Sequence, residues 1–374
     1  MNMDTGYKRT TCRLCRSHVW TKYIFNPTPI ANLFPDTPYT GEKHPLVLCQ
    51  CGSCGHVQIG WVVDDKVLYG AGYKYSTPQA LMPQMMDRAL VLRKQYPNAK
   101  NVLEIGANNG LFVHAMRYAG FRTYGIDPSS SSEIVIPRPF NKASAEDIVR
   151  VSGKMDLILA NNVFAHIDDL ESVFDAINII LSKDGTLIFE VQYVVPMMEI
   201  GAFDMIYHEH RDYHALAPLA RFLKLKNMVM TGYDIIPAHG GSIRVTAKRC
   251  GLEVKLPKED LDWRGFAESI DSENAYINSQ IKGKIAAFGA PAKAVTFIHH
   301  FELQDKIKYC VDDTPGKQGK YIAGTNIPVV SREFMEQDKP ERMLLLSWNY
   351  EALIRPQFPD IDFLVPFSRI EETA

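Results

Sequence analysis

The sequence predicts an α/β protein in which a small cysteine-rich module precedes two doubly wound sheets. Three observations support this prediction. Five of the seven cysteines lie within residues 12–54. From about residue 100, short apolar runs alternate with helical stretches, a pattern typical of a parallel sheet covered by helices. A second alternation begins near residue 281. We therefore divide the chain into residues 1–80, 81–250 and 251–374.

The overall composition excludes some classes of protein. The 374 residues can form two or three domains, and 41 Lys and Arg against 43 Asp and Glu leave a formal net charge of -2. This balance argues against a general nucleic-acid binder. No apolar run reaches the length of a membrane span, and the N-terminus lacks the apolar core of a signal peptide. We expect a cytoplasmic protein that binds neither nucleic acid nor membranes, and its oligomeric state stays open, a monomer included.

Two C-x2-C pairs, Cys12 with Cys15 and Cys51 with Cys54, are the main feature of the first 80 residues. Together they supply the four sulfur ligands of a structural zinc site, which has no open position for catalysis. Unligated or redox-active cysteines are the alternative. Cys49 is a second alternative, since it can replace Cys51, but Cys51 gives two matching pairs.

The rest of this module has several prolines and few long periodic runs, so we expect it to be rich in loops. The remaining cysteines, Cys250 and Cys310, are expected to be ordinary buried residues.

The middle segment reads as a parallel α/β unit. Its expected strands are residues 101–105, 122–126, 155–160, 186–191 and, later, 241–249. Its expected helices are residues 81–97, 111–119 and 170–181.

The last segment repeats this pattern on a smaller scale. Residues 250–280 are polar and expected to be largely helical. Strands are expected at residues 284–290, 307–313 and 343–349, with a turn and a helix at 291–301.

Residues 102–110 (VLEIGANNG) have the pattern of a strand, a glycine turn and a helix start. Gly106 and Gly110 allow the backbone to approach a ligand closely. The G-x3-G spacing, with Glu104 just before the turn and Asn108 within it, favours S-adenosylmethionine (SAM) over NAD. The dinucleotide fingerprint G-x-G-x-x-G is absent.

Polar residues also end the next two strands. Asp127 follows the second strand, and its carboxylate suits two ribose hydroxyls. Asn161 and Asn162 follow the third strand, at the sheet edge where ligands of open α/β sheets bind. A doubly wound domain that binds another nucleotide is the alternative.

Residues 207–214 (YHEHRDYH) are dense in acid–base groups. Acid–base chemistry is the favoured interpretation. A metal site is a second, because His210 and His214 have the i, i+4 spacing of ligands on a helix. A polar surface turn is the third.

The order of these motifs resembles that of the SAM-dependent sugar C-methyltransferase family, and the likeness covers nearly the whole chain. The motifs that carry it are the two C-x2-C pairs and residues 54–58, 72–76, 104–110, 161–166, 207–213, 239–242, 288–293, 312–320 and 347–349. The resemblance implies a zinc-binding N-terminal module, a SAM-binding class I methyltransferase domain and a Rossmann-like C-terminal domain. It implies SAM and structural Zn²⁺ as cofactors and a nucleotide-linked 4-keto-deoxysugar, bound between the last two domains, as the substrate.

By the same likeness, His210 is the general base, with Glu209 and Tyr207 beside it. His166 would contact the sugar together with one of Tyr73 and Tyr75.

Two departures from the family pattern stand out. The usual Asn-Asp-Gly is Asn108-Asn109-Gly110 here, which weakens a contact near SAM while Asp127 keeps the ribose role. Arg211 and Asp212 replace an aromatic and polar segment, which bears on the identity of the sugar more than on the reaction.

Carbon methylation explains why these groups would be needed. A ketone makes the neighbouring proton removable as an enolate, and histidine is the base best suited to this near neutral pH. Tyr207, His166 and Tyr75 are donors of the type that stabilises the enolate oxygen. Glu209 would orient His210. An O- or N-methyltransferase could use the same histidine, and a ligand-binding relative without activity is a further alternative.

The remaining substrate candidates lie around the second sheet. The turn after Gly289 leads to Lys293, where a helix N-terminus and a cation would hold the diphosphate. Lys317 and Lys320 are further cations, although charged loops are usually only solvated. Three more residues are candidates for binding the substrate: His239, Gly240 and Tyr213.

Overall fold

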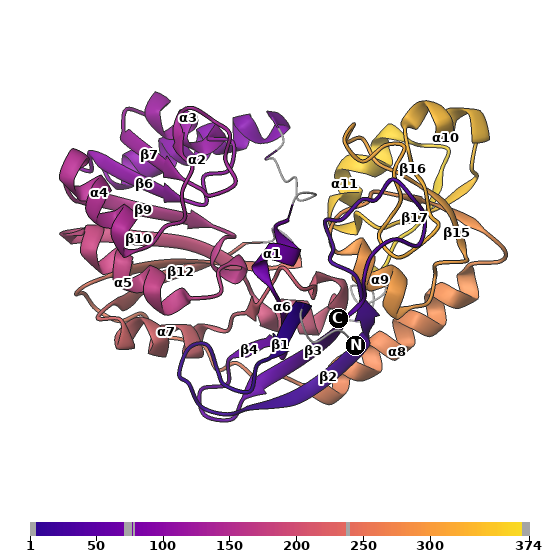
Figure 1. Ribbon diagram of the computed structural model, residues 1–374, viewed down its shortest axis with the longest axis horizontal. Helices are drawn as coiled ribbons and strands as arrows, with labels where there is room; N and C mark the ends of the chain where they lie inside the picture. Colours follow the sequence, from indigo (N-terminus) through magenta and orange to yellow (C-terminus); the bar gives the residue numbers. More distant parts are fainter. Residues whose placement is uncertain (1–4, 71–76, 78, 237–239, 369–374) are drawn as a thin grey trace.

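The computed structural model describes residues 5–70, 77, 79–236 and 240–368. Two α/β lobes stand side by side above an N-terminal antiparallel sheet (Figure 1). None of the described helices combines the length and the apolar character that crossing a bilayer requires.

The N-terminal module contains more regular structure than the sequence suggested. Its four-stranded sheet has the order β11-β4-β3-β2 and is antiparallel throughout. The strands are β2 (Val19–Thr28), β3 (His44–Cys51), β4 (Val57–Ile59) and β11 (Asp212–Tyr213). A separate ribbon pairs β1 (Gly6–Lys8) with β5 (Trp61–Val63). More than half of residues 5–70 nevertheless lie outside these strands and α1 (Asp65–Leu68), so the module is also rich in loops, as expected. Within this range the prolines lie at strand ends and in the loop between β2 and β3.

The central sheet has seven strands in the order β12-β13-β10-β9-β6-β7-β8. Five strands are parallel, and β12 and β13 add an antiparallel edge. The bounds are β6 (Asn101–Ile105), β7 (Arg122–Ile126), β8 (Val135–Ile136), β9 (Met155–Asn161), β10 (Leu181–Gln192), β12 (Val229–Ile236) and β13 (Ser242–Lys248). The sequence predicted every strand of this sheet except β8 and β12.

Helices cover both faces of the central sheet because side chains alternate along each strand. In β6, Val102 packs with α2 and α3, whereas Leu103 faces the cluster that contains α4 and α5. The helices are α2 (Met82–Gln95), α3 (Leu111–Tyr118), α4 (Lys142–Ser152), α5 (Leu170–Ile180) and α7 (Leu216–Leu225). Leu181, expected to end α5, is instead the first residue of β10.

The C-terminal sheet is wholly parallel, with the order β16-β15-β14-β17-β18. Its strands are β14 (Ile285–Phe288), β15 (Ile307–Val311), β16 (Val329–Val330), β17 (Arg342–Leu345) and β18 (Asp362–Leu364). Its helices are α8 (Trp263–Gln280), α9 (Ala294–His300), α10 (Arg332–Asp338) and α11 (Glu351–Ile354). Only the second part of the expected helical stretch 250–280 is helical.

Cys310 is buried as expected, but Cys250 is exposed, since it lies in the turn that follows β13.

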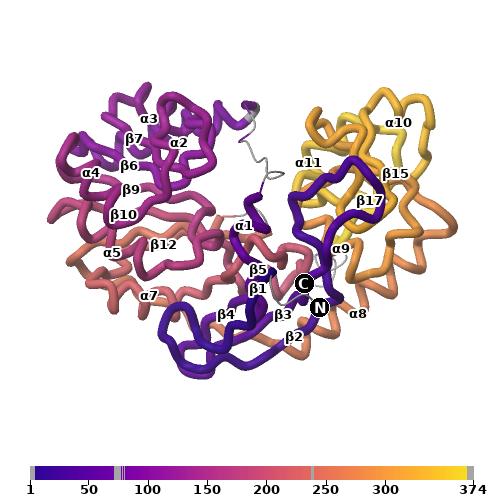
Figure 2. Tube along the Cα trace, viewed as in Figure 1, coloured from indigo at the N-terminus to yellow at the C-terminus, as the bar shows by residue number. Residues whose placement is uncertain are grey.

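One apolar core joins the three parts of the chain. It combines Leu46 and Leu48 of β3, Phe203 of the central segment, and Phe297 of α9. The loop of residues 29–43, between β2 and β3, extends to the C-terminal lobe (Figure 2), where the Tyr39 N–H donates to the carbonyl of Thr325 at 2.7 Å. The lobes are thus held on a shared base rather than joined only by a linker.

Candidate functional site

The four cysteines of the two C-x2-C pairs converge on one point. Their sulfur atoms all lie within 4.8 Å of one another, with 3.7 Å between Cys12 and Cys54 and 3.4 Å between Cys15 and Cys51. Zn–S bonds of about 2.3 Å in a tetrahedron separate sulfur atoms by about 3.8 Å, so this arrangement suits a zinc ion. Cys49 lies apart from the cluster, with its sulfur 3.9 Å from the Thr21 hydroxyl. The geometry therefore favours Cys51 over Cys49.

The glycine turn after β6 has the backbone conformation that only glycine adopts easily. Gly106 and Gly110 have φ of 72° and 81°, and Gly110 caps α3. A Cβ on Gly106 would lie 2.3 Å from Val163 Cγ2, because the turn passes directly beside the end of β9. The turn and the two neighbouring strand ends therefore form one compact edge.

Asp127 fixes this turn from the end of β7. Its carboxylate accepts the Asn108 N–H at 3.0 Å and, through the other oxygen, the Ser129 N–H at 2.8 Å. Asn108 Oδ1 in turn accepts the Thr77 N–H at 2.9 Å, and the Asn109 amide donates to the Thr77 carbonyl. Asn109, where the family pattern has an acid, thus helps to hold residue 77 against the turn.

Glu104 is the buried acid of this edge. Its Oε1 accepts a bond of 3.5 Å from the side-chain amide of Asn161, while Oε2 is buried and has no hydrogen-bond partner among the described residues. Burial raises the pKa of Glu104 to about 8, against the opposing effects of Asn161 and Arg88. Asn162 follows with φ of 52°, and its N–H donates to the Glu190 carbonyl. Glu104 therefore presents a free acceptor to any ligand of the turn.

Residues 206–214 are the point where the three parts of the chain meet. The Thr296 hydroxyl of α9 donates to the Ile206 carbonyl at 2.7 Å. The Arg211 N–H donates to the Ala165 carbonyl, just beyond β9, at 2.8 Å. The following strand, β11, pairs with β4 of the N-terminal sheet. This segment is an extended turn and not a helix, so the metal-site interpretation of His210 and His214 was wrong.

Tyr207 and His210 of this segment lie beside His166. The Tyr207 hydroxyl lies 2.7 Å from His210 Nε2, and the rings of His210 and His166 meet edge to face with centroids 4.9 Å apart. Burial, with Arg211 nearby, lowers the pKa of His166 to about 4, so His166 is neutral at pH 7. The arrangement can exchange a proton between a tyrosine and a histidine beside a second, neutral imidazole.

Two predicted neighbours of His210 have other surroundings. The Glu209 side chain turns toward the N-terminal module, where Oε1 accepts the N–H groups of Ala31 and Asn32 at 3.0 and 3.1 Å. It therefore does not orient His210, because the Tyr207 hydroxyl takes that place. Tyr213 is fully buried, and its hydroxyl contacts the Tyr207 N–H and the Met205 carbonyl. The expected contact of Tyr213 with substrate was wrong, since its buried hydroxyl instead binds the backbone at residues 205 and 207.

Lys293 lies at the start of α9 but does not present a free cation. Its Nζ is 3.3 Å from Asp204 Oδ2 and 3.6 Å from the ring centre of Trp348. Burial lowers the pKa of Lys293 to about 8, against the effect of Asp204. The Trp348 N–H also donates to Asp204, and a Cβ on Gly240 would lie 2.9 Å from the Trp348 ring. Gly240 and Lys293 are therefore brought together around Trp348.

The other predicted cations are tied to neighbouring groups. Lys317 donates to the Ala290 carbonyl at 2.9 Å and to Asp312 at 3.2 Å, beside the turn that starts at Gly289. Lys320 Nζ lies 3.6 Å from Oδ1 of Asp36, an exposed residue in the loop of residues 29–43. The two lysines do not converge on one point. Three further candidates, Tyr73, Tyr75 and His239, lie outside the described residues.

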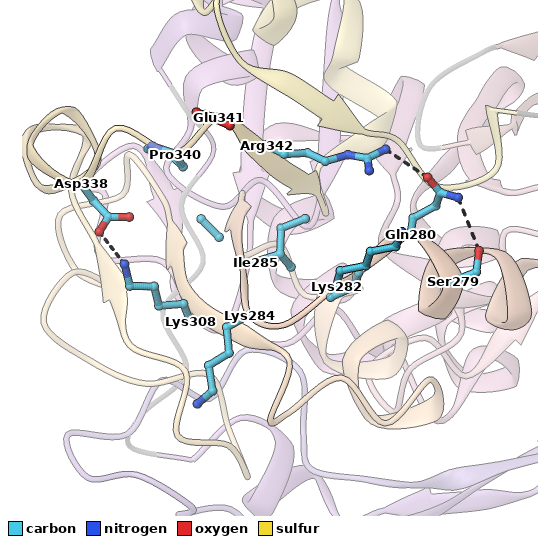
Figure 3. Close-up of a pocket in the computed structure, with 12 residues that line it drawn as sticks. Ser279, Gln280, Lys282, Lys284, Ile285, Lys308, Asp338, Pro340, Glu341 and Arg342 are labelled. Atoms are coloured by element: carbon cyan, nitrogen blue, oxygen red, sulfur yellow. Dashed lines mark hydrogen bonds and ion pairs between the residues drawn. The ribbon is translucent and has the colours of Figure 1, made fainter.

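A polar groove of about 560 Å³ lies at the opposite edge of the C-terminal sheet, at the beginnings of β14, β15 and β17 (Figure 3). Two of its charged side chains have partners within the groove: Lys308 pairs with Asp338 at 2.5 Å, and Arg342 donates to Gln280 at 3.3 Å. It contains none of the predicted site residues, so we place the functional site at the carboxyl edges of the two sheets.

The sequence did not reveal the contacts of three residues that build the site. Arg13, between the first two cysteines, pairs with Asp212, and both are buried. Arg211 donates to the His166 carbonyl at 2.5 Å. Although burial alone would raise the pKa of Asp212, Arg13 and His56 hold it well below its usual range. Nothing in the local sequence marks these contacts, because Arg13 and Asp212 are far apart along the chain.

Comparison with known proteins finds two matching families. Residues 79–231 match the family described as methyltransferase domain, and residues 273–362 match the C-methyltransferase C-terminal domain. The chain is 29% identical to C-methyltransferase NovU of Streptomyces niveus over 378 residues, which covers 91% of this chain and 90% of that protein.

Solved structures with similar folds include methyltransferases. One is the 1,6-didemethyltoxoflavin-N1-methyltransferase of Burkholderia thailandensis, with 16% identity, 52% of this chain and 96% of that chain covered, and a TM-score of 0.33. Another is the PH0226 protein of Pyrococcus horikoshii, with 12% identity, 46% and 92% covered, and a TM-score of 0.36.

Proposed function

Because the chain is a SAM-dependent methyltransferase that carries a C-methyltransferase C-terminal domain, we propose that it methylates a carbon atom of a nucleotide-linked 4-keto-deoxysugar. The observation that carries this proposal is the Tyr207–His210 pair beside His166, at the segment where all three parts of the chain meet. This segment contacts residue 165, just beyond β9, and α9 of the C-terminal lobe, so a cofactor on one sheet and a sugar nucleotide on the other would both come close to His210.

In the proposed reaction, His210 removes the proton next to the ketone. The Tyr207 hydroxyl, 2.7 Å from His210 Nε2, orients the imidazole and stabilises it when it is protonated. His166 stays neutral, and the single N–H of a neutral imidazole can donate a hydrogen bond to the enolate oxygen. The resulting carbanion would take the methyl group of SAM in line, as the bond between that methyl group and the sulfonium sulfur breaks and S-adenosylhomocysteine leaves.

SAM supplies that methyl group as an electrophile. Gly106 and Gly110 would let its methionine part approach the backbone, and Asp127 would accept bonds from its ribose. Glu104 Oε2 is buried and has no hydrogen-bond partner among the described residues. The methionine ammonium of SAM would supply the missing donor. We further propose that Cys12, Cys15, Cys51 and Cys54 bind one structural zinc ion.

Incubation of the protein with a 4-keto nucleotide deoxysugar in D₂O tests the proposal. Without SAM, the carbon next to the ketone should exchange its proton for deuterium, and with SAM it should gain a methyl group on carbon. His210→Gln should lower both rates by about 10²- to 10⁴-fold, the usual contribution of a general base, and leave SAM binding intact. His114→Gln, on the exposed face of α3, serves as the matched control.

Two results would count against the proposal. A methyl ether product would assign the enzyme to oxygen rather than carbon. Undiminished deuterium exchange in His210→Gln would move the base to another residue.

A further inference from the structure

The cysteine cluster and the two facing histidines are connected by one buried side chain. Arg13 lies between Cys12 and Cys15, and its side chain is only 3% exposed. One nitrogen of its guanidinium pairs with Asp212, two residues beyond His210. A second guanidinium nitrogen, Nη2, donates to the carbonyl of Ile167 and, at 3.2 Å, to that of Asp168. These two residues directly follow His166. Arg13 therefore contacts both segments that carry the reactive imidazoles.

Other contacts make this connection stiff. The backbone N–H of Arg13 donates to Gln58 Oε1 at 2.9 Å, and Gln58 lies on β4, the strand that pairs with β11. The second oxygen of Asp212 lies 2.8 Å from His56 Nε2. Both carboxylate oxygens of Asp212 are thus engaged by residues of the N-terminal module. A planar guanidinium with fixed donors sets both distance and direction, which a flexible ammonium cannot do.

We propose that Arg13 is a positioning residue, through which the zinc-binding knuckle holds His166 and His210 at their mutual distance and angle. This inference rests on the proposed role of His210. Under it, the cysteine cluster contributes to turnover as well as to the stability of its own module. A misplacement of a catalytic group by about 1 Å can lower a rate by about 100-fold, so a modest shift of either segment is sufficient.

Arg13→Lys and Asp212→Asn test the connection from its two ends. Each should lower kcat by about 10- to 100-fold, with zinc content retained and with KM and SAM affinity within about twofold of wild type. Arg16→Lys is the matched control, because Arg16 belongs to the same knuckle but pairs with Glu171 on the surface, where it is 68% exposed. Unchanged kcat in Arg13→Lys, an equal loss in Arg16→Lys, or a rise in KM alone would overturn the proposal.

Histidine NMR separates this inference from the proposed function. With ¹³Cε1-labelled histidine, the signals of His166 and His210 are assigned from their Gln variants. Both signals should shift in Arg13→Lys and not in Arg16→Lys, whether or not His210 is the base. If His210→Gln keeps its deuterium exchange, the proposed function fails while the positioning result stands. Unshifted signals in Arg13→Lys would refute the positioning role alone.

Hydrogen exchange of the wild-type protein covers the case in which both variants misfold. After removal of the metal by a thiol reagent and chelator, amide exchange should rise at residues 164–168 and 207–214 before it rises at residues 101–113 of the glycine turn. No rise at the two histidine segments, or an equal rise throughout the chain, would contradict the proposal.

Discussion

At the scale of single residues, Glu104 shows how burial prepares a group for its ligand. One of its oxygens has no partner among the described residues, and burial raises its pKa to about 8. At pH 7 the side chain is therefore mostly protonated in the free protein. A bound ammonium favours the ionised form, so ligand binding and deprotonation of Glu104 are linked.

The sign of this linkage gives a prediction. Between pH 7 and 8.5 the ionised fraction of Glu104 grows, so the affinity for S-adenosylhomocysteine, which keeps the methionine ammonium, should rise by about five- to tenfold. Glu104→Gln should bind more weakly and lose this pH dependence. Calorimetric titration at several pH values measures both effects. The same slope in wild type and Glu104→Gln would mean that another group titrates.

The candidate residues differ in how far the sequence could predict them. Glu104 and Asp127 follow from local pattern, because a strand, a turn and a strand end fix their place in the fold. Glu209 was misassigned to His210, since adjacency along the chain does not tell which way a side chain turns. The Arg13–Asp212 pair was not predictable at all, because it forms only when β11 joins the N-terminal sheet.

At the scale of elements, the turn between β6 and α3 depends on a glycine in two separate ways. Gly106 needs a positive φ, and it also needs the space that a side chain would take from Val163. Gly153, after α4, has a similar φ of 78° but nothing within 4 Å of a built Cβ. Alanine variants at these two positions can therefore distinguish the cost of backbone strain from the cost of close packing.

Alanine at these glycines should have unequal effects. Gly153→Ala carries only the strain of a backbone conformation (φ 78°, ψ -168°) that is essentially restricted to glycine, a cost of about 1–3 kcal/mol, and should leave SAM affinity unchanged. Gly106→Ala adds overpacking of about 1–3 kcal/mol and should weaken SAM binding by at least about tenfold. Urea unfolding and calorimetric titration provide the two measurements. Equal losses of stability with intact SAM binding in both variants would show that the approach to Val163 is not important.

Prediction of elements from the sequence worked where periodicity was strong. β14 is a continuous apolar run and β6 and β9 are mostly apolar, and their positions in parallel sheets were foreseen. The position of β7 was foreseen as well, although only part of it is apolar. β12 (Val229–Ile236) is an edge strand that contains Gly232 and exposes both Asp234 and Ile235, so its pattern is weak. β11 has two residues and no local signal, because only its partner β4 makes it a strand. Pairing partners, and not propensity, decide such segments.

At the scale of the whole molecule, the ion pair between Asp204 and Lys293 is a joint between the central segment and the C-terminal lobe. Both residues are buried, and Trp348 covers the pair and donates to Asp204 at 2.7 Å. Phe203 packs beside it against Phe297 of α9. Since a buried ion pair offsets its own desolvation only while both charges are present, removal of one partner is costly.

Lys293→Met alone should therefore destabilise the protein by about 3–5 kcal/mol, because it leaves the Asp204 carboxylate buried without a cation. The double variant Asp204→Asn/Lys293→Met should recover most of this loss, since the amide oxygen still accepts the Trp348 N–H and no charge remains buried. Urea unfolding of the four proteins in this cycle gives the coupling free energy. If Lys293 acts only as the joint, the KM for the sugar nucleotide should return toward the wild-type value along with stability. A KM that stays high in the stable double variant would instead assign Lys293 to the substrate diphosphate.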